Sequence, residues 1–411
     1  MTKQYDFNYK NFILYGIVFE IMMKLHRPFA VKFLERIGGS DLHISLFNSL
    51  PGFVMFLAVL PGAILIRRYA DKKKITGILI FISRMPILLI AFIPMLPLGY
   101  QPIVFILLMA VLNGPNAVYM TSYQSFLGEL FDNNERAKAI GDRNRYTMVA
   151  ILIVTFLVGQ ILTLLPGNEA QRIQIYQLFF VAAFIMGMIE LKVFSRFKVD
   201  HHHDSKPEKT VDVLRQVTKN KGFLAFMGCS LLYHFGWQMA WPLFNIYTIK
   251  VLGANESWLS VIQIAQAMVM FFGYKFWTKQ IEKHGNPIVT AICTMGMAIT
   301  PLLYILSKNL YVLTGTTVVS GLFTAGTITV LLTDLLEVTP QKDKVLYLGF
   351  YNTFINLSMG ISPLVGHYFL KSRGIYFALG AAAFFRMIGS ITFFIRRYRM
   401  RNEHLTEIDN M

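Results

Sequence analysis

Three charged side chains share one face of the first long apolar run of the chain. Glu20, Lys24 and Arg27 are spaced i, i+4 and i+7, which places them within about 60° of one another on a helix. A charge at the middle of a bilayer costs about 2.5–3.5 kcal/mol on insertion scales, so such residues normally face a cavity or a partner. The stripe predicts a polar binding face. The alternative is that Glu20 and Lys24 neutralise each other, which leaves only Arg27 to explain.

A second polar stripe lies 214 positions further on, where His234, Gln238 and Trp241 repeat the spacing and Asn245 adds one turn. Glu20 and His234 are the candidates for proton coupling, because each can change charge when a neighbour or a ligand moves. In the first stripe Lys24 and Arg27 outnumber Glu20. This excess of positive charge predicts a ligand that carries an anionic group.

The elements that hold these stripes are predicted to be membrane-spanning helices. The chain has 411 residues, of which 55% are hydrophobic and only 15% charged, and this is too apolar for a soluble globular protein. A span needs about 20 mainly apolar residues. Twelve such runs lie near 12–34, 43–66, 75–95, 103–128, 146–165, 173–194, 223–247, 257–277, 287–306, 310–336, 345–370 and 375–395.

The net charge is +16, and the basic residues lie mainly in alternate loops of the predicted topology rather than in one patch. With the N-terminus inside, one set of loops and both tails hold 28 of the 39 Lys and Arg residues, whereas the opposite loops hold seven. By the positive-inside rule, both termini are expected in the cytoplasm of a multi-pass protein of the cell membrane. The basicity therefore reflects topology, and no nucleic-acid partner is expected.

An internal repeat divides the chain. Pro28 is followed eleven positions later by Gly39, and Pro242 is followed eleven positions later by Gly253. Such a repeat indicates duplication. The predicted division is a first six-helix half at 1–194, a cytoplasmic linker at 195–222, a second six-helix half at 223–395 and a cytoplasmic tail at 396–411.

Other polar residues interrupt the predicted spans. Arg84 and Arg386 lie near the middle of spans three and twelve, where each needs a carboxylate, carbonyl groups or water. A structural helix–helix pair and a role in substrate binding both remain open for them. Asn113 and Gln124 lie on one face of span four, where amides either bind a ligand or pack helices together.

A charged hinge joins spans two and three and returns, altered, between spans eight and nine. Asp71-Lys72 follows Gly62, and Glu282-Lys283-His284-Gly285 follows Gly273. This hinge is similar to the loop signature Gly-x-x-x-Asp-Arg/Lys-x-Gly-Arg/Lys-Arg/Lys of the major facilitator superfamily of secondary transporters, although Asp71 lies nine positions after Gly62 where the signature has four. The six-plus-six plan extends the resemblance over essentially the whole chain.

The resemblance implies an all-α membrane fold of twelve transmembrane helices, arranged as two six-helix halves related by the repeat. It also implies that the first span of each three-helix unit lines a central pathway. In this superfamily the hinge aspartate is thought to latch the closed inner face through charge pairs. That role would pass to Asp71 and Glu282, with the basic residues Arg136, Arg143 and Arg145 facing Asp71.

The expected function is secondary active transport of a small solute by alternating access, coupled to protons or another ion. Export of amphipathic drug-like compounds or lipids is one alternative, and a non-transporting receptor or scaffold on the same fold is another. The chain shows no phosphate-binding Gly-Lys-Ser/Thr loop, no nucleophile–base set and no metal-ligand spacing, so neither an enzyme nor a cofactor or metal is expected. Its expected partners are the substrate and the lipid bilayer, and it is expected to be a monomer.

Overall fold

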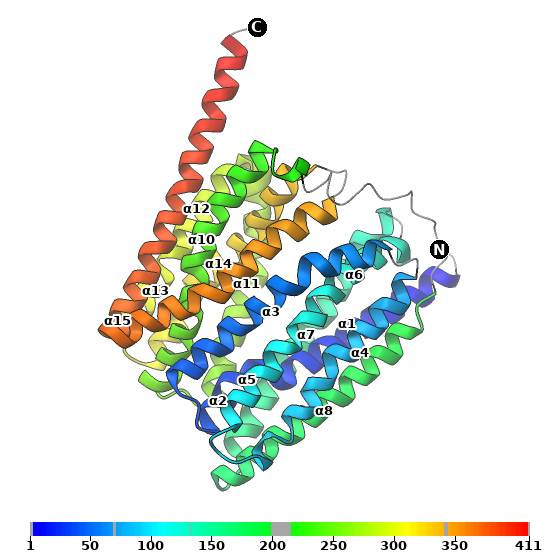
Figure 1. The fold of residues 1–411 in the computed structure, drawn as a ribbon, viewed down its shortest axis with the longest axis vertical. Coiled ribbons are helices and arrows are strands. Elements are labelled where there is room, and N and C mark those ends of the chain that lie inside the picture. The colour runs from blue at the N-terminus through cyan, green and yellow to red at the C-terminus, as the bar shows by residue number, and fades with distance from the viewer. Residues whose placement is uncertain (1–2, 69–70, 132, 199–214, 341–343, 410–411) are drawn as a thin grey trace. The chain divides into compact units, whose positions relative to one another are not determined.

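The computed structural model describes residues 3–68, 71–131, 133–198, 215–340 and 344–409 (Figure 1). Throughout these ranges the regular elements are helices, so the prediction of an all-α membrane fold is confirmed. Helices suit a bilayer because each satisfies its backbone hydrogen bonds within itself. The described residues fall into two compact units: residues 1–208 with 255–260 form unit 1, and residues 209–254 with 261–411 form unit 2.

In unit 1, α1 packs against α7 and α8, and α4 packs against α6 and α8 (Figure 1). The first element is broken near Pro28, which lies in the short 3-10 turn that follows the end of α1 at His26. The elements are α1 (Lys3–His26), η1 (Arg27–Phe29), α2 (Ala30–Arg36), α3 (Asp41–Arg68), α4 (Lys72–Ile90), η2 (Ile93–Met95), α5 (Gln101–Val111), α6 (Asn113–Leu130), α7 (Asn133–Leu164) and α8 (Glu169–Ser195).

In unit 2, α10 packs along α15, and α12 packs against both α14 and α15. Gly374 has a positive φ of 83°, which splits α15 into two helices that together supply the last two spans. The elements are α10 (Lys221–Ile246), the π-helical turn η3 (Tyr247–Val251), α11 (Glu256–His284), α12 (Asn286–Ala298), α13 (Thr300–Leu306), α14 (Leu310–Val338) and α15 (Lys344–Asp409). The first turns of α11 belong to unit 1.

Nine helical stretches of the described residues are long and apolar enough to cross a membrane, and the last of them contains the break at Gly374. The helices that carry the two polar stripes, α1 and α10, fall outside this set because their polar residues lower the mean hydropathy. The nine stretches are Asp41–Ile66, Lys73–Met95, Gln101–Met120, Asp142–Leu164, Glu169–Ser195, Glu256–His284, Asn286–Leu306, Leu310–Val338 and Leu346–Met400.

Candidate functional site

The first polar stripe runs from α1 into η1, where its last residue, Arg27, reaches α6. Glu20 and Lys24 are partly buried, whereas Arg27 is exposed. Arg27 Nη2 donates to Asn113 Oδ1 at 3.0 Å, and Asn113 Nδ2 donates to the carbonyl of Met109 at 2.6 Å. Because the amide nitrogen donates to Met109 in the preceding helix, α5, the amide oxygen is left to face Arg27. The structure therefore brings together two of the predicted binding residues, Arg27 and Asn113.

The two cations of this stripe have no carboxylate partner within ion-pair distance among the described residues. Glu20 and Lys24 do not form an ion pair with each other, although Glu20 lies near enough to Arg27 to attract its charge. Arg27 instead bonds to a neutral amide. The stripe thus presents uncompensated positive charge at the junction of α1 and η1, and an internal Glu20–Lys24 pair does not account for it.

Arg84, by contrast, is fully engaged inside unit 1. It is 2% exposed and makes a bidentate pair with Glu190 of α8, with Nε to Oε2 at 3.0 Å and Nη2 to Oε1 at 3.1 Å. Nη1 donates to Ser83 Oγ at 3.0 Å. Gly187 lies one turn before Glu190, and a Cβ there would be 3.0 Å from the side chain of Arg84. Through these contacts the Arg84–Glu190 ion pair holds α4 against α8.

The second stripe lies on α10 in unit 2. His234 Nδ1 is 2.8 Å from the carbonyl of Ser230, which places the proton of the neutral ring on Nδ1 and leaves Nε2 as an acceptor. Its ring lies beside Trp237, whose ring in turn contacts Trp241. Gln238 is 2% exposed. Trp241 and Asn245 are partly buried further along α10.

Arg386 of α15 is completely buried and donates to three backbone carbonyls. The acceptors are Gly236 at 3.3 Å, Trp237 at 3.1 Å and Met297 at 3.1 Å. Met297 precedes Pro301 by four positions, and proline has no N–H to offer this carbonyl. Arg386 therefore gives the carbonyl of Met297 the donor that Pro301 cannot supply. Its three hydrogen bonds also hold α10 and α12 against α15.

A second buried arginine pair in unit 2 was not predicted. Arg396 makes a bidentate pair with Asp334 of α14, with Nη1 to Oδ2 at 2.8 Å and Nη2 to Oδ1 at 3.0 Å. Thr290 of α12 also donates to Asp334 Oδ2, at 3.3 Å. From the sequence, residues 396–411 are predicted to form a cytoplasmic tail that begins with Arg396. The structure shows it 8% exposed.

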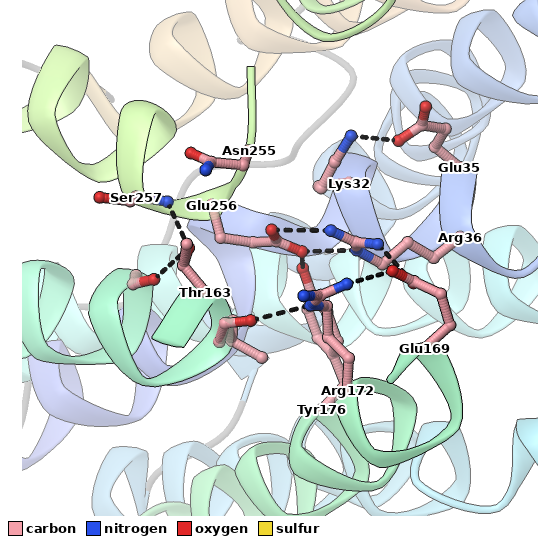
Figure 2. A network of polar contacts seen from close by, with 12 residues as sticks. Lys32, Glu35, Arg36, Thr163, Glu169, Arg172, Tyr176, Asn255, Glu256 and Ser257 are labelled. Atoms are coloured by element: carbon pink, nitrogen blue, oxygen red, sulfur yellow. Dashed lines mark hydrogen bonds and ion pairs between the residues drawn. The ribbon is translucent and has the colours of Figure 1, made fainter. Parts of the chain in front are cut away.

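A third network lies where α2, α8 and α11 meet within unit 1 (Figure 2). Arg36 Nε and Nη2 donate to Glu256 Oε1 and Oε2 at 2.6 and 2.9 Å, and Tyr176 Oη donates to Glu256 Oε1 at 2.8 Å. Arg36 Nη1 also donates to Glu169, at 2.5 Å, and Glu169 pairs with Arg172. The side chain of Glu256 is 1% exposed and that of Glu169 is 65% exposed.

The same helix begins with backbone and side-chain contacts to α7. The backbone N–H of Ser257 donates to Thr163 Oγ1 at 3.0 Å, and Gln160 Nε2 donates to Ser257 Oγ at 2.8 Å. At Gly159 a Cβ would be 2.5 Å from Ser260 Oγ, so glycine permits this close approach. Nothing in the sequence pointed to this network, because its members are separated by up to 220 positions.

The residues predicted as a gate have the following surroundings where the structure describes them. Asp71 caps α4, accepting from the backbone N–H of Lys74 at 2.8 Å. Arg143 lies over the ring of Phe12, Arg145 and Glu282 are exposed, and no ion pair joins Asp71 to Arg143 or Arg145 in the described ranges. The side chains of Arg136 and Gln124 lie outside the described residues.

A hydrogen bond near the start of α1 joins this helix to an acidic residue of α7. Tyr9 Oη donates to Asp142 Oδ2 of α7 at 2.6 Å. This bond to the carboxylate, together with burial, raises the pKa of Tyr9 to about 12. Tyr9 is therefore neutral across the physiological pH range and remains a donor to α7.

Two substitutions distinguish a helix-capping role of Asp71 from a role as a charged gate residue. We expect Asp71→Asn to leave the melting temperature of the purified protein unchanged, since asparagine caps a helix as well as aspartate does. Asp71→Ala should cost about 1 kcal/mol because the Lys74 N–H loses its acceptor. Equal losses in both variants, measured by thermal unfolding, would instead show that the charge itself is needed.

Comparisons with known proteins agree with this architecture. A sequence model of the major facilitator superfamily matches residues 12–231 and again residues 226–409. A search of curated protein sequences gave no match. A crystal structure of a mutant of the nucleoside transporter NupG is similar to this chain with a TM-score of 0.72 and 10% identity, covering 94% of this chain and 99% of that one.

A second solved structure is a bacterial homologue of the human lysosomal transporter Spinster in an inward-facing, unoccupied conformation. It is similar with a TM-score of 0.66 and 12% identity, covering 96% of this chain and 97% of that one. At these identities the two structures support the fold. The sequence model covers both halves of the repeat, and the chain therefore belongs to the major facilitator superfamily.

Proposed function

We propose that this protein is a secondary transporter that moves a small solute with an anionic group by alternating access. The observation that carries the proposal is an uncompensated pair of cations, Lys24 near the end of α1 and Arg27 at the start of η1. Lys24 and Arg27 have no carboxylate within ion-pair distance among the described residues, whereas Arg36, Arg84 and Arg396 each have one. A carboxylate or phosphate would accept hydrogen bonds from the remaining N–H groups of Arg27, because the guanidinium fork matches the geometry of both groups.

Asn113 positions Arg27 for this role. Its amide oxygen accepts from Nη2 only, which leaves the other guanidinium N–H groups available to a ligand. The bond to a neutral amide holds the side chain in place without cancelling its charge. An anion that binds there gains a charge-assisted hydrogen bond as well as the attraction of Lys24.

For coupling we propose Glu20 and His234. Glu20 lies near Arg27, so an anion that binds Arg27 competes with the Glu20 carboxylate for the charge of the guanidinium. His234 keeps Nε2 free to take up a proton, since Nδ1 is committed to Ser230. The two residues are on helices that the repeat relates, α1 and α10.

We propose that the protein lies in the cell membrane as a monomer with both termini in the cytoplasm. The support is the excess of Lys and Arg in one set of loops. In this orientation the Arg36–Glu256 network lies on the extracellular side, and the Asp71 cap and the Tyr9–Asp142 bond lie on the cytoplasmic side. The partners are then the substrate and lipid, and the protein moves a solute rather than converting it chemically.

The test of this proposal measures uptake of carboxylates and organic phosphates into proteoliposomes at several pH values. We expect Lys24→Gln and Arg27→Gln to weaken anion binding by roughly 10- to 150-fold, the equivalent of one charge-assisted hydrogen bond. Lys32→Gln is the matched control, because Lys32 is already paired with Glu35 at 2.6 Å. Uptake that stays at the wild-type level in both stripe variants would refute an anionic substrate.

One observation supports a second candidate, the export of an amphipathic compound. In unit 2 the rings of Tyr233, His234, Trp237 and Trp241 form a continuous series of contacts along α10. Such a series binds flat apolar ligands without a charge requirement. Thermal-shift screening separates the candidates, since amphipathic ligands would stabilise Arg27→Gln as well as the wild type. Absence of any flux in sealed vesicles would point to a receptor or scaffold.

A further inference from the structure

Three buried oxygen atoms on the interface of α10 and α15 have no hydrogen-bond partner within the described part of the chain. They are Gln238 Oε1, Ser358 Oγ and Ser362 Oγ, here called the oxygen cluster. Their side chains are 2%, 8% and 0% exposed, respectively. A buried polar atom without a partner normally costs about 1–3 kcal/mol, so three of them in one interface require an explanation.

The three residues lie along the same seam of unit 2. Gln238 Nε2 donates to the carbonyl of Ile355 at 3.3 Å, and a Cβ at Gly366 would lie 2.6 Å from the carbonyl of Met239. Residues 355, 358, 362 and 366 follow the i, i+3, i+7 and i+11 positions of one helix face. Ser358 and Ser362 therefore lie on the side of α15 that packs against α10, between two observed contacts.

The identity of the amide oxygen follows from the bond that its nitrogen makes. Because Nε2 donates to Ile355, the atom left unpaired on Gln238 is the oxygen, which can only accept. The two hydroxyls can accept as well. The oxygen cluster is thus a set of acceptors without a dedicated donor.

Two prolines leave two further acceptors on the same two helices. Pro242 lies inside α10 and Pro363 inside α15, and neither has an N–H group. The backbone carbonyls four positions earlier, those of Gln238 and Met359, therefore lack their usual helical donor. Backbone carbonyls of interrupted helices are the ligands that bind alkali cations inside membrane transport proteins.

We propose that the oxygen cluster, with these two carbonyls, is a binding site for Na⁺. All of its atoms are uncharged oxygens, which suit a hard monovalent cation. A divalent cation such as Ca²⁺ or Mg²⁺ would lack the carboxylates it requires, and a transition metal would lack nitrogen or sulfur ligands. Arg386 holds the carbonyls of Gly236 and Trp237 on a neighbouring face of α10, and its charge disfavours a divalent ion more than a monovalent one.

This inference goes beyond the proposed function, since it concerns a cation and not the anionic substrate, and binding can be tested without any transport assay. Full-length protein is purified in choline chloride. Its melting temperature is then measured by tryptophan fluorescence while choline is replaced by Na⁺ or K⁺ at constant ionic strength. We expect a saturable increase with Na⁺ and a much smaller one with K⁺.

The variants Ser358→Ala and Ser362→Ala should abolish the increase with Na⁺. In choline they should melt at or above the wild-type temperature, because each removes a hydroxyl that has no partner. Ser390→Ala is the matched control. Ser390 is equally buried on α15, but its hydroxyl already donates to the carbonyl of Arg386 at 2.8 Å, so the response to Na⁺ should remain.

Equilibrium binding of radioactive Na⁺ to the same variants gives a second readout that does not depend on unfolding. Loss of bound Na⁺ in the two serine variants and its retention in Ser390→Ala supports the site. A wild-type protein that binds no Na⁺, or a response that persists in the double variant Ser358→Ala/Ser362→Ala, would overturn it. Because the anion assay uses different residues on α1, failure here leaves the substrate proposal intact.

Discussion

Glu190→Leu is expected to destabilise the protein by about 3–5 kcal/mol, because it leaves Arg84 buried without its carboxylate. Arg84 is 2% exposed and Glu190 is completely buried, so water does not replace the lost partner. The remaining contacts of Arg84, to Ser83 and Asn116 at 3.0 and 3.4 Å, are to neutral groups. The measurement is thermal unfolding of the purified full-length protein in choline chloride.

A double variant separates the loss of an ion pair from the creation of an unpaired charge. Arg84→Met/Glu190→Leu removes both charges and replaces them with apolar groups of similar volume, so it should regain most of the stability. Glu35→Gln is the control, since Lys32 and Glu35 form an i,i+3 pair at 2.6 Å in which the glutamate side chain is 29% exposed. It should cost less than about 1 kcal/mol. A double variant as unstable as Glu190→Leu would show that the pair has a further role.

The membrane fold and the repeat could be predicted from the sequence because they rest on local patterns. Long apolar runs specify helices in a bilayer, and charges specify which loops connect them. The repeat is also visible in backbone geometry. Gly38 and Gly253 have φ values of 91° and 70° and follow the broken first helix of each half, close to the predicted pair of Gly39 and Gly253.

The partners of the buried charges could not be predicted, because they are distant in sequence. Arg84 clearly needed compensation, but Glu190 lies 106 positions away, and no spacing rule connects them. The sequence did not mark Asp334 as the partner of a buried arginine, because acidic residues are common near the ends of helices. Arg386 shows the other limit: its partners are backbone carbonyls, which no side-chain pattern reveals.

These arginines have a common effect on each unit. In unit 1, Arg84 joins α4 to α8, and in unit 2, Arg386 and Arg396 join α15 to α10, α12 and α14. A buried, multiply bonded guanidinium resists local rearrangement, since any shift leaves charge or carbonyl groups unpaired. These contacts therefore hold the helices within each unit together. Lys24 and Arg27 differ because they lack such a set of bonds, which is the reason for our proposal that they bind the substrate.

The second large effect is expected at the Arg36–Glu256 network (Figure 2). Arg36→Met leaves the buried Glu256 carboxylate without its cationic partner, although the hydroxyl of Tyr176 still donates to it, so we expect a loss of about 3–5 kcal/mol. Glu256→Gln should cost less than Arg36→Met, because Arg36 retains Glu169 and the amide can still accept from the guanidinium.

Glu169→Gln is the matched control, because it touches the same guanidinium from the exposed side. Its side chain is 65% exposed, so water compensates the lost charge and the cost should stay below about 1 kcal/mol. The measurement is thermal unfolding of the three variants at low and high salt. Salt should change the effect of Glu169→Gln and leave that of Arg36→Met nearly constant, since buried pairs are screened much less. Equal losses for Glu169→Gln and Glu256→Gln would contradict this, because burial of Glu256 is the property that makes its pair with Arg36 the stronger one.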